Sequence, residues 1–300
     1  MSKAFKLQPA VKSYIWGGNY FQKFGKGNQE VISELWELSA RGEDSSLIVS
    51  GPLKSKKLSN VLDKLDLGAN TVRFPYFPLL IKLIDAKENL SVQVHPSDDY
   101  ALANENSFGK SEMWHIIDAD ENAGLYIGLK RNSSRDEISA KLNDGSILDV
   151  LNFVKVKPGD TFMINPGTIH AIGKGVRLIE IQQNSDLTYR LYDYNRVDKN
   201  GNKRELHILK ALNVIDYKKY IFNEPDGYII GDSKYFKVER IEFNRELTIT
   251  ANQGSFVSFT FIKGRGKVDD IPFNTFDTFF LPNNESCKVK GEGIVIVSRV

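Results

Sequence analysis

The sequence predicts a mostly β protein, built as a sandwich or barrel of antiparallel sheets with a few helical insertions. Short runs rich in Val, Ile, Phe and Tyr dominate the chain, and Gly, Asn and Pro separate them. The runs recur at roughly 8–12-residue intervals, as in sandwiches and barrels. Composition agrees, because 41% hydrophobic and 26% charged residues are typical of a folded globular chain.

The first two thirds of the chain contain five predicted strands and three predicted helices. The strands alternate apolar and polar residues and cover 90–95, 113–118, 161–165, 176–182 and 188–193. The helices cover 98–104, with Ser97 or Asp98 as cap, 134–142, which begins with a capping-type sequence, and 206–215, whose apolar residues fall near one face. We expect the helices to be excursions between strands.

The last third is predicted to form a small all-β unit. Its strands cover 236–243, 247–250, 256–262, 277–281 and 294–297, and 263–266 is predicted to be a hairpin turn. A turn-rich segment near 220–228 follows the last helical pattern. We therefore expect two domains, a larger one over 1–222 and a smaller one over 223–300.

Charge and cysteine content exclude several classes of protein. The net charge is only +2, which gives no basic surface for nucleic acid or an acidic membrane. The single cysteine, Cys287, cannot form an internal disulfide, and we expect it to be buried and inert. The longest apolar run, 74–81, is far shorter than the ~20 residues of a membrane helix, and the N-terminus lacks a signal-peptide core. A cytoplasmic location is expected.

Four side chains have the types and spacing of a metal site. Gln93 and His95 lie two apart in a predicted strand, so they share a face opposite the neighbouring valines. Glu112 begins another strand-like run, and His170 follows a turn at 166–167. Nitrogen and oxygen ligands without cysteine suit Zn²⁺ or another divalent transition metal, with one position open for substrate or water.

Ordinary packing is the competing interpretation of these residues. A histidine in a strand is often a hydrogen-bonded core residue, and spacing alone leaves both interpretations open. His115 and His207 have no companion ligand at useful spacing, so we expect structural roles for them. The stretch 177–196 is predicted to be a hairpin with a turn at 184–186; it could be a surface hairpin with salt bridges or a pocket wall whose arginines face an anion.

Several motifs, in order along the chain, resemble those of the type I phosphomannose isomerases, in particular their short bacterial branch. The resemblance runs from about residue 7 to the C-terminus. The matching segments are 15–18, 34–39, 77–96, 109–114, 165–171 and 180–196. They include Gln93-Val-His95-Pro96, Lys110-Ser-Glu112-Met-Trp114 and Asn165-Pro-Gly-Thr-Ile-His170.

This resemblance implies a cupin-type jelly-roll β-barrel with one zinc ion, and a second, degenerate barrel at the C-terminus. The implied activity interconverts mannose 6-phosphate and fructose 6-phosphate through an enediol or enediolate. The family's zinc ligands fall on the four residues that spacing had suggested. Its other site residues fall on Arg190, on Glu180 and Lys110, and on the substrate-binding positions Trp16, Lys82, Ser91 and Arg196.

The resemblance leaves the general base and the exact substrate open. Glu180 ranks first as base, before Lys110 and a metal-bound water, while Ser91, Lys82 and Arg196 would hold the phosphate. Alternatives are a sugar-phosphate-binding or regulatory module without turnover, a storage-type barrel, and an isomerase for another phosphosugar such as glucose 6-phosphate. No nucleic-acid or membrane partner is expected, and the sequence does not indicate the oligomeric state.

Overall fold

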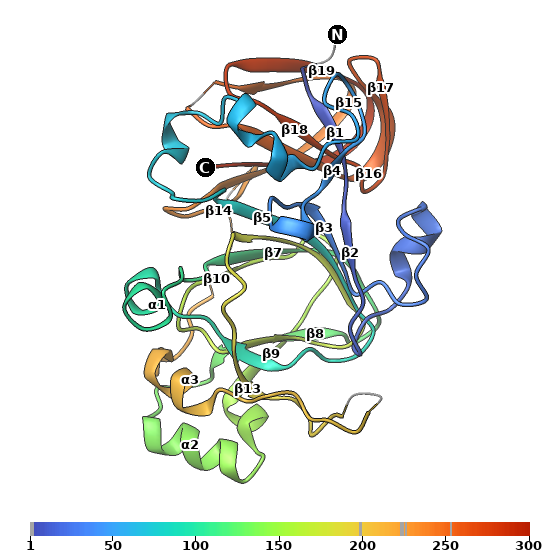
Figure 1. Ribbon diagram of the computed structural model, residues 1–300. Coiled ribbons are helices and arrows are strands. Elements are labelled where there is room, and N and C mark those ends of the chain that lie inside the picture. The colour runs from blue at the N-terminus through green and yellow to red at the C-terminus, as the bar shows by residue number, and fades with distance from the viewer. Residues whose placement is uncertain (1–2, 198–199, 223–224, 226, 253) are drawn as a thin grey trace. The chain divides into compact units, whose positions relative to one another are not determined.

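The computed structural model describes residues 3–197, 200–222, 225, 227–252 and 254–300 (Figure 1). The backbone divides into two compact units. Unit 1 comprises Met1–Lys12, Asn19–Leu83 and Pro225–Val300, and unit 2 comprises Ser13–Gly18 and Ile84–Glu224. This grouping joins N-terminal segments to the C-terminal strands, and the division into domains 1–222 and 223–300 stays a prediction. Within the described ranges, no helix has the length and apolar character needed to span a membrane.

Two antiparallel sheets form unit 2. One contains, in spatial order, β10 (Thr161–Ile164), β7 (Glu112–Ala119) and β12 (Val176–Gln183). The other has the order β13 (Tyr189–Tyr192), β6 (Val92–Val94), β11 (His170–Ile172), β8 (Gly124–Leu129) and β9 (Leu151–Lys155). The five strands predicted in this part of the chain are therefore confirmed, each within a few residues.

The apolar residues of unit 2 fall into two clusters. One joins Trp114 and Leu178 of the first sheet to Ile127 of the second, so it occupies part of the space between the sheets. The other contains Val92 and Val94, which alternation had predicted to face away from Gln93. This second cluster covers the outer side of β6, and helix residues complete it.

Three helices are inserted between the strands of unit 2, as predicted. They are α1 (Asp98–Glu105), α2 (Arg135–Asn143) and α3 (Ile208–Val214), with a 3₁₀ turn, η6, at Ile147–Val150. Ser97 caps α1 and Ser134 caps α2, each by accepting a hydrogen bond from a backbone N–H in the first turn. Buried residues of α2 and α3 belong to the cluster on the outer side of β6.

A large antiparallel sheet dominates unit 1 (Figure 1). Its order is β14 (Ile229–Asp232), β15 (Lys237–Ala251), β19 (Glu285–Arg299), β16 (Val257–Val268), β18 (Thr278–Leu281), β1 (Phe5–Gln8) and β4 (Leu47–Ile48), with β17 (Ile271–Asn274) on β16. β2 (Ala10–Lys12) pairs with β3 (Glu34–Leu38), and β5 (Leu79–Ala86), which is next to β3 in the strand order, begins in this unit. Short 3₁₀ turns are Tyr20–Phe24, Gly42–Asp44, Leu58–Asn60, Leu62–Lys64 and Ala69–Thr71.

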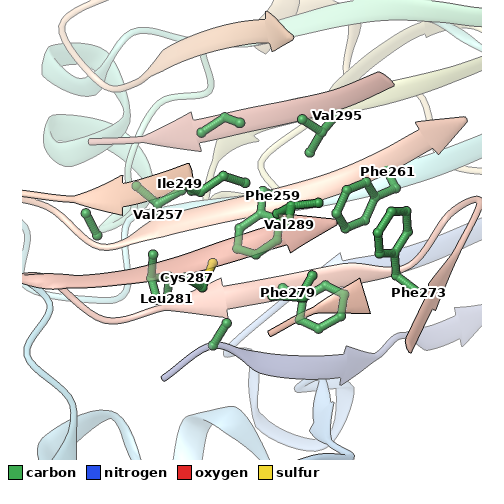
Figure 2. Packing of buried hydrophobic residues seen from close by; sticks show 14 of the residues in the cluster. Ile249, Val257, Phe259, Phe261, Phe273, Phe279, Leu281, Cys287, Val289 and Val295 are labelled. Atoms are coloured by element: carbon green, nitrogen blue, oxygen red, sulfur yellow. The ribbon is translucent and has the colours of Figure 1, made fainter. Parts of the chain in front are cut away.

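The core of the large sheet is almost entirely apolar. Figure 2 shows Phe259, Phe261, Phe273 and Phe279 beside aliphatic side chains from neighbouring strands. Phe261 and Phe273 stack with ring centroids 3.6 Å apart, and Phe259 stacks on Phe279 at 5.3 Å. Cys287 lies within this core and is 2% exposed, as predicted.

Three local predictions are wrong. Residues 263–266 lie inside β16 and not in a turn. Gly264 pairs with Gly293 of β19, and a Cβ on Gly264 would lie 2.1 Å from the Glu292 carbonyl oxygen, so the glycines allow two strands to approach closely. The predicted strands 236–243 and 247–250 are one continuous strand, β15. Finally, 177–196 is not a hairpin, because β12 pairs with β7 and β13 pairs with β6.

Candidate active site

Three buried side chains of unit 2 bring possible metal ligands together where its two sheets face each other. Glu112 begins β7, His170 begins β11, and His95 directly follows β6. Glu112 Oε1 lies 3.3 Å from His170 Nε2, and its Oε2 lies 3.6 Å from His95 Nε2. One ligand atom from each residue lies within 4.8 Å of the others, and the amide nitrogen of Gln93 lies 3.3 Å from His170 Nε2. The four predicted ligands are therefore neighbours.

Backbone carbonyls fix the rings of both histidines. Nδ1 of His95 donates to the Leu187 carbonyl oxygen at 2.9 Å, and Nδ1 of His170 donates to that of Thr168 at 2.8 Å. Each ring therefore presents Nε2 to the Glu112 carboxylate, which is how histidines are held as metal ligands. Burial lowers the pKa of His170 to about 4 against the opposing effect of the Thr168 carbonyl, so its ring is neutral at pH 7.

Lys110 and Glu180 adjoin this group. Lys110 Nζ lies 2.6 Å from Glu112 Oε2 and 3.3 Å from His95 Nε2. Glu180 comes from β12, and its Oε1 lies 3.9 Å from Lys110 Nζ. Its other carboxylate oxygen accepts a hydrogen bond from Trp114 Nε1 at 2.8 Å. Two carboxylates and one ammonium thus share a space that is closed to solvent, since each of these side chains is at most 6% exposed.

Arg190 lies beside the ligand group on the second sheet of unit 2. It is the cross-strand partner of Gln93, and cross-strand partners project from the same face. Its Nε donates to Ser91 Oγ at 3.3 Å, and its Nη1 donates to the Glu205 carbonyl oxygen at 2.8 Å. His207 is joined to the backbone of Arg190 by two hydrogen bonds, which fits the structural role predicted for it.

A second feature is an arginine cluster around Asp193. Arg196 and Arg204 both donate to the Asp193 carboxylate, and the Nε bond from Arg204 is 2.7 Å long. Burial opposes the ionisation of Asp193, but the two arginines outweigh it and lower the pKa of this carboxyl. Burial and then the charge of Arg204 lower the pKa of Arg190. Three guanidinium groups therefore interact around one carboxylate, which leaves a local excess of positive charge around Asp193.

Lys82 and Trp16 are two further residues that were predicted to bind substrate. Lys82 belongs to unit 1, where its Nζ lies 3.6 Å from Glu34 Oε2 and 5.5 Å from the centroid of the Trp36 ring. Trp16 is 3% exposed within the apolar cluster between the sheets of unit 2, and it stacks on Tyr14. Their contacts with substrate remain predictions.

Sequence reasoning missed two residues of this region. Arg204 lies between Lys203 and Glu205, and such charged runs usually form a solvated face. Trp114 was part of a quoted motif, but no role was predicted for it. Alternation could have suggested one, because Trp114 lies two residues after Glu112 on the same face of the strand.

Comparison with known proteins identifies the family. Residues 4–122 match the family described as phosphomannose isomerase type I, catalytic domain. The chain is 34% identical to mannose-6-phosphate isomerase ManA of Bacillus subtilis (strain 168) over 98% of both chains, and 32% identical to mannose-6-phosphate isomerase of Streptococcus mutans over 99% of this chain and 98% of the relative.

Solved structures agree with the sequence comparison. The crystal structure of mannose 6-phosphate isomerase from Bacillus subtilis matches the whole of both chains with a TM-score of 0.90 and 36% identity. Phosphomannose isomerase from Salmonella typhimurium has the same fold at 17% identity, with a TM-score of 0.80 over 99% of both chains. The predicted cupin-like, mostly β fold is confirmed, and the chain belongs to the type I phosphomannose isomerase family.

Proposed function

We propose that the protein is a metal-dependent aldose–ketose isomerase that interconverts mannose 6-phosphate and fructose 6-phosphate. The observation that carries the proposal is the meeting of His95, Glu112 and His170 from two facing sheets, with Lys110 and Glu180 beside them. Burying polar and charged side chains costs free energy that an apolar core would not cost. The presence of this buried polar group therefore indicates a function. The identity of the substrate is inferred from the names of the related isomerases.

We further propose that the resident metal is one Zn²⁺ per chain. Two imidazole nitrogens, one carboxylate and the amide of Gln93 form the mixed nitrogen and oxygen set that suits zinc. The single carboxylate among the ligands, Glu112, leaves a local charge near +1. When bound, zinc supplies a Lewis acid that stabilises negative charge on the oxygens at C1 and C2 of the sugar.

Glu180 is the residue that we propose as general base. Isomerisation of the aldose removes a proton from C2 and returns one to C1, while a proton moves from O2 to O1. Lys110 is already a donor to Glu112 and His95, so its placement suits donation to a developing oxyanion. Glu180 is an acceptor at the same place, and one of its oxygens is held by an indole N–H.

Arg190, Ser91 and Arg196 are proposed to bind the sugar phosphate. Arg190 lies beside Gln93, where its fixed charge would stabilise the enediolate or the phosphate. Arg196 belongs to the cluster around Asp193, whose excess positive charge suits a dianion. Binding the remote phosphate would position the reacting end of the sugar.

The test is a coupled assay of the conversion of mannose 6-phosphate into fructose 6-phosphate, with glucose 6-phosphate as the competing aldose. We expect turnover of mannose 6-phosphate to exceed that of glucose 6-phosphate clearly. Turnover of glucose 6-phosphate alone would favour an isomerase for another phosphosugar. Tight binding of either sugar without turnover would favour the binding or regulatory module.

We also propose a cytoplasmic location, because the chain has one cysteine and a small net charge.

A further inference from the structure

Trp114 is a fully buried side chain that contacts two residues of the candidate active site. It lies in β7, directly across from Glu180 in β12, and its exposed fraction is 0%. Its indole N–H donates to Glu180 Oε2 at 2.8 Å. Its ring meets that of His170 edge to face, with centroids 5.3 Å apart and planes at 79°.

The hydrogen bond from Trp114 restricts the direction of the Glu180 carboxylate. A glutamate side chain has three rotatable torsions, and a bond from a rigid ring on the neighbouring strand fixes the end of that chain. With Oε2 held by the indole, Oε1 is the oxygen that lies toward Lys110, at 3.9 Å from Nζ. The indole thereby determines which carboxylate oxygen is presented to the reacting space.

The contact with His170 has a different character. The ring of His170 already donates through Nδ1 to the Thr168 carbonyl oxygen, and that bond sets its orientation. The edge-to-face contact with Trp114 adds packing but no hydrogen bond. Removal of the indole N–H should therefore disturb Glu180 far more than the metal ligands.

We infer that Trp114 is a positioning residue, which holds the Glu180 carboxylate in the orientation needed for proton transfer. This inference rests on the proposed isomerase function. It goes beyond that function, because it gives a role in proton transfer to a core residue that does not touch the substrate. Proton transfer needs the base within hydrogen-bond reach of its proton. A misoriented Glu180 carboxylate should therefore reduce kcat without weakening substrate binding.

The first variant is Trp114→Phe, which keeps an aromatic ring but removes the N–H donor. We expect kcat to fall about 10- to 100-fold, the range that a misplacement near 1 Å can cause, while KM and bound metal stay near the wild-type values. Ile116→Ala is the matched control: Ile116 belongs to the same apolar cluster and strand, and its cross-strand partner is Leu178. This control should lower the unfolding temperature but leave kcat near the wild-type value.

A double-mutant cycle tests whether Trp114 acts through Glu180. Glu180→Gln removes the base, so Trp114→Phe should cause no further loss of kcat in that background. Multiplied losses in the double variant, or an unchanged kcat in the single variant, would overturn the inference. Loss of metal in Trp114→Phe would also overturn it, since the residue would then act through His170.

Indole proton NMR supplies a readout that needs neither activity nor a stable Trp114 variant. Glu180→Gln replaces a charged acceptor by a neutral one, so the Trp114 indole N–H resonance should move upfield. The Trp36 indole, which donates to Glu34 at 2.7 Å, is the internal control and should not move. An unmoved Trp114 resonance would contradict the contact itself. An inactive wild-type enzyme with the expected NMR shift would instead contradict only the proposed function.

Discussion

The two units of the molecule bury side chains of opposite character. The core of the large sheet in unit 1 is built from phenylalanines and aliphatic residues, with Cys287 among them (Figure 2). Unit 2 buries His95, Lys110, Glu112 and His170, and the Glu112 carboxylate lies within 3.6 Å of a nitrogen atom of each of the other three. Buried apolar area stabilises a fold directly, whereas buried charges are costly unless they are paired or coordinate a metal.

The thiol of Cys287 illustrates what the apolar environment does to a reactive group. Burial raises the pKa of Cys287 to about 12, with a smaller contribution from the charge of Asp269. The thiolate is the nucleophile and the metal ligand, so a thiol that stays protonated is inert. In unit 2 the buried imidazole of His170 stays neutral and points its Nε2 at the Glu112 carboxylate, which keeps it able to bind a metal. The buried groups of unit 2 are therefore suited to chemistry, whereas the buried groups in the large sheet of unit 1 are suited to stability.

The largest predicted effect follows from His170→Ala. Removal of one imidazole ligand should lose the metal and reduce kcat at least ~10³-fold, which is about 4 kcal/mol. The measurement combines metal analysis with the isomerase assay. His115→Gln is the matched control, because His115 in β7 is likewise a buried histidine, but its ring bonds to Thr161 Oγ1. A His170→Ala protein that kept metal and activity would remove this residue from the ligand set.

The corresponding change in unit 1 is Phe259→Ala. Phe259 is 0% exposed and stacks on Phe279, so its truncation should cost about 3–5 kcal/mol of unfolding free energy. The kcat of the folded protein should remain near the wild-type value. Urea unfolding and the isomerase assay on the same sample check both statements. A loss of kcat in fully folded protein would break the division of roles between the units.

Arg190→Ala should separate charge stabilisation from metal binding. We expect kcat to fall about 10²- to 10³-fold, or roughly 3–4 kcal/mol, while bound metal is unchanged. Metal should stay bound because Arg190 is not one of the proposed ligands. It lies beside Gln93, but its guanidinium donates to Ser91 and to the Glu205 carbonyl oxygen. Steady-state kinetics with metal analysis provides the measurement. If kcat held and only KM rose, Arg190 would instead bind the substrate equally in the ground and transition states.

Glu37 is an exception to the apolar character of unit 1, and it predicts a pH-dependent stability. Burial raises the pKa of this carboxyl to about 7, against the opposing charge of Lys26, from an ordinary value of 4.5. The unfolded chain therefore releases this proton near pH 4.5, and the folded chain releases it only near pH 7. The contribution of Glu37 to stability is complete at low pH and falls as the pH rises through that window.

Glu37→Gln removes this titration. The variant should gain up to about 3 kcal/mol of unfolding free energy relative to wild type at pH 8, with a much smaller difference at pH 4. Urea unfolding of both proteins at the two pH values measures this difference in unfolding free energy. A difference that did not change with pH would show that the carboxyl has an ordinary pKa in the folded protein.

The sequence predicted the parts of the site that depend on local alternation. Gln93 and His95 share a strand face with the valines opposite, and this follows from the period of a strand alone. Residue type and spacing also suggested Glu112 and His170, and the motif resemblance then implied that all four are metal ligands. Arg204 could not be predicted in this way, since its contact with Asp193 depends on how a loop folds back.

The fold was predicted in class but not in its long-range pairing. β1 pairs with β18, so Phe5 lies opposite Phe280, although most of the chain separates the two residues in sequence. Nothing in a short N-terminal run indicates such a partner, which is why the grouping of units differs from the predicted domain ranges. Gly264 and Gly266 were misinterpreted for a related reason: a glycine pair is typical of a turn, and only the pairing with β19 shows that it serves close strand approach.

The central claim is that the buried polar group of unit 2 holds a metal that the isomerase reaction needs. The most direct measurement is the rate of mannose 6-phosphate conversion in chelator-treated protein during titration with Zn²⁺, with bound metal determined on the same samples. We expect activity to disappear with the metal and to return in proportion to added zinc, up to one ion per chain. Full activity in protein stripped of metal would contradict it.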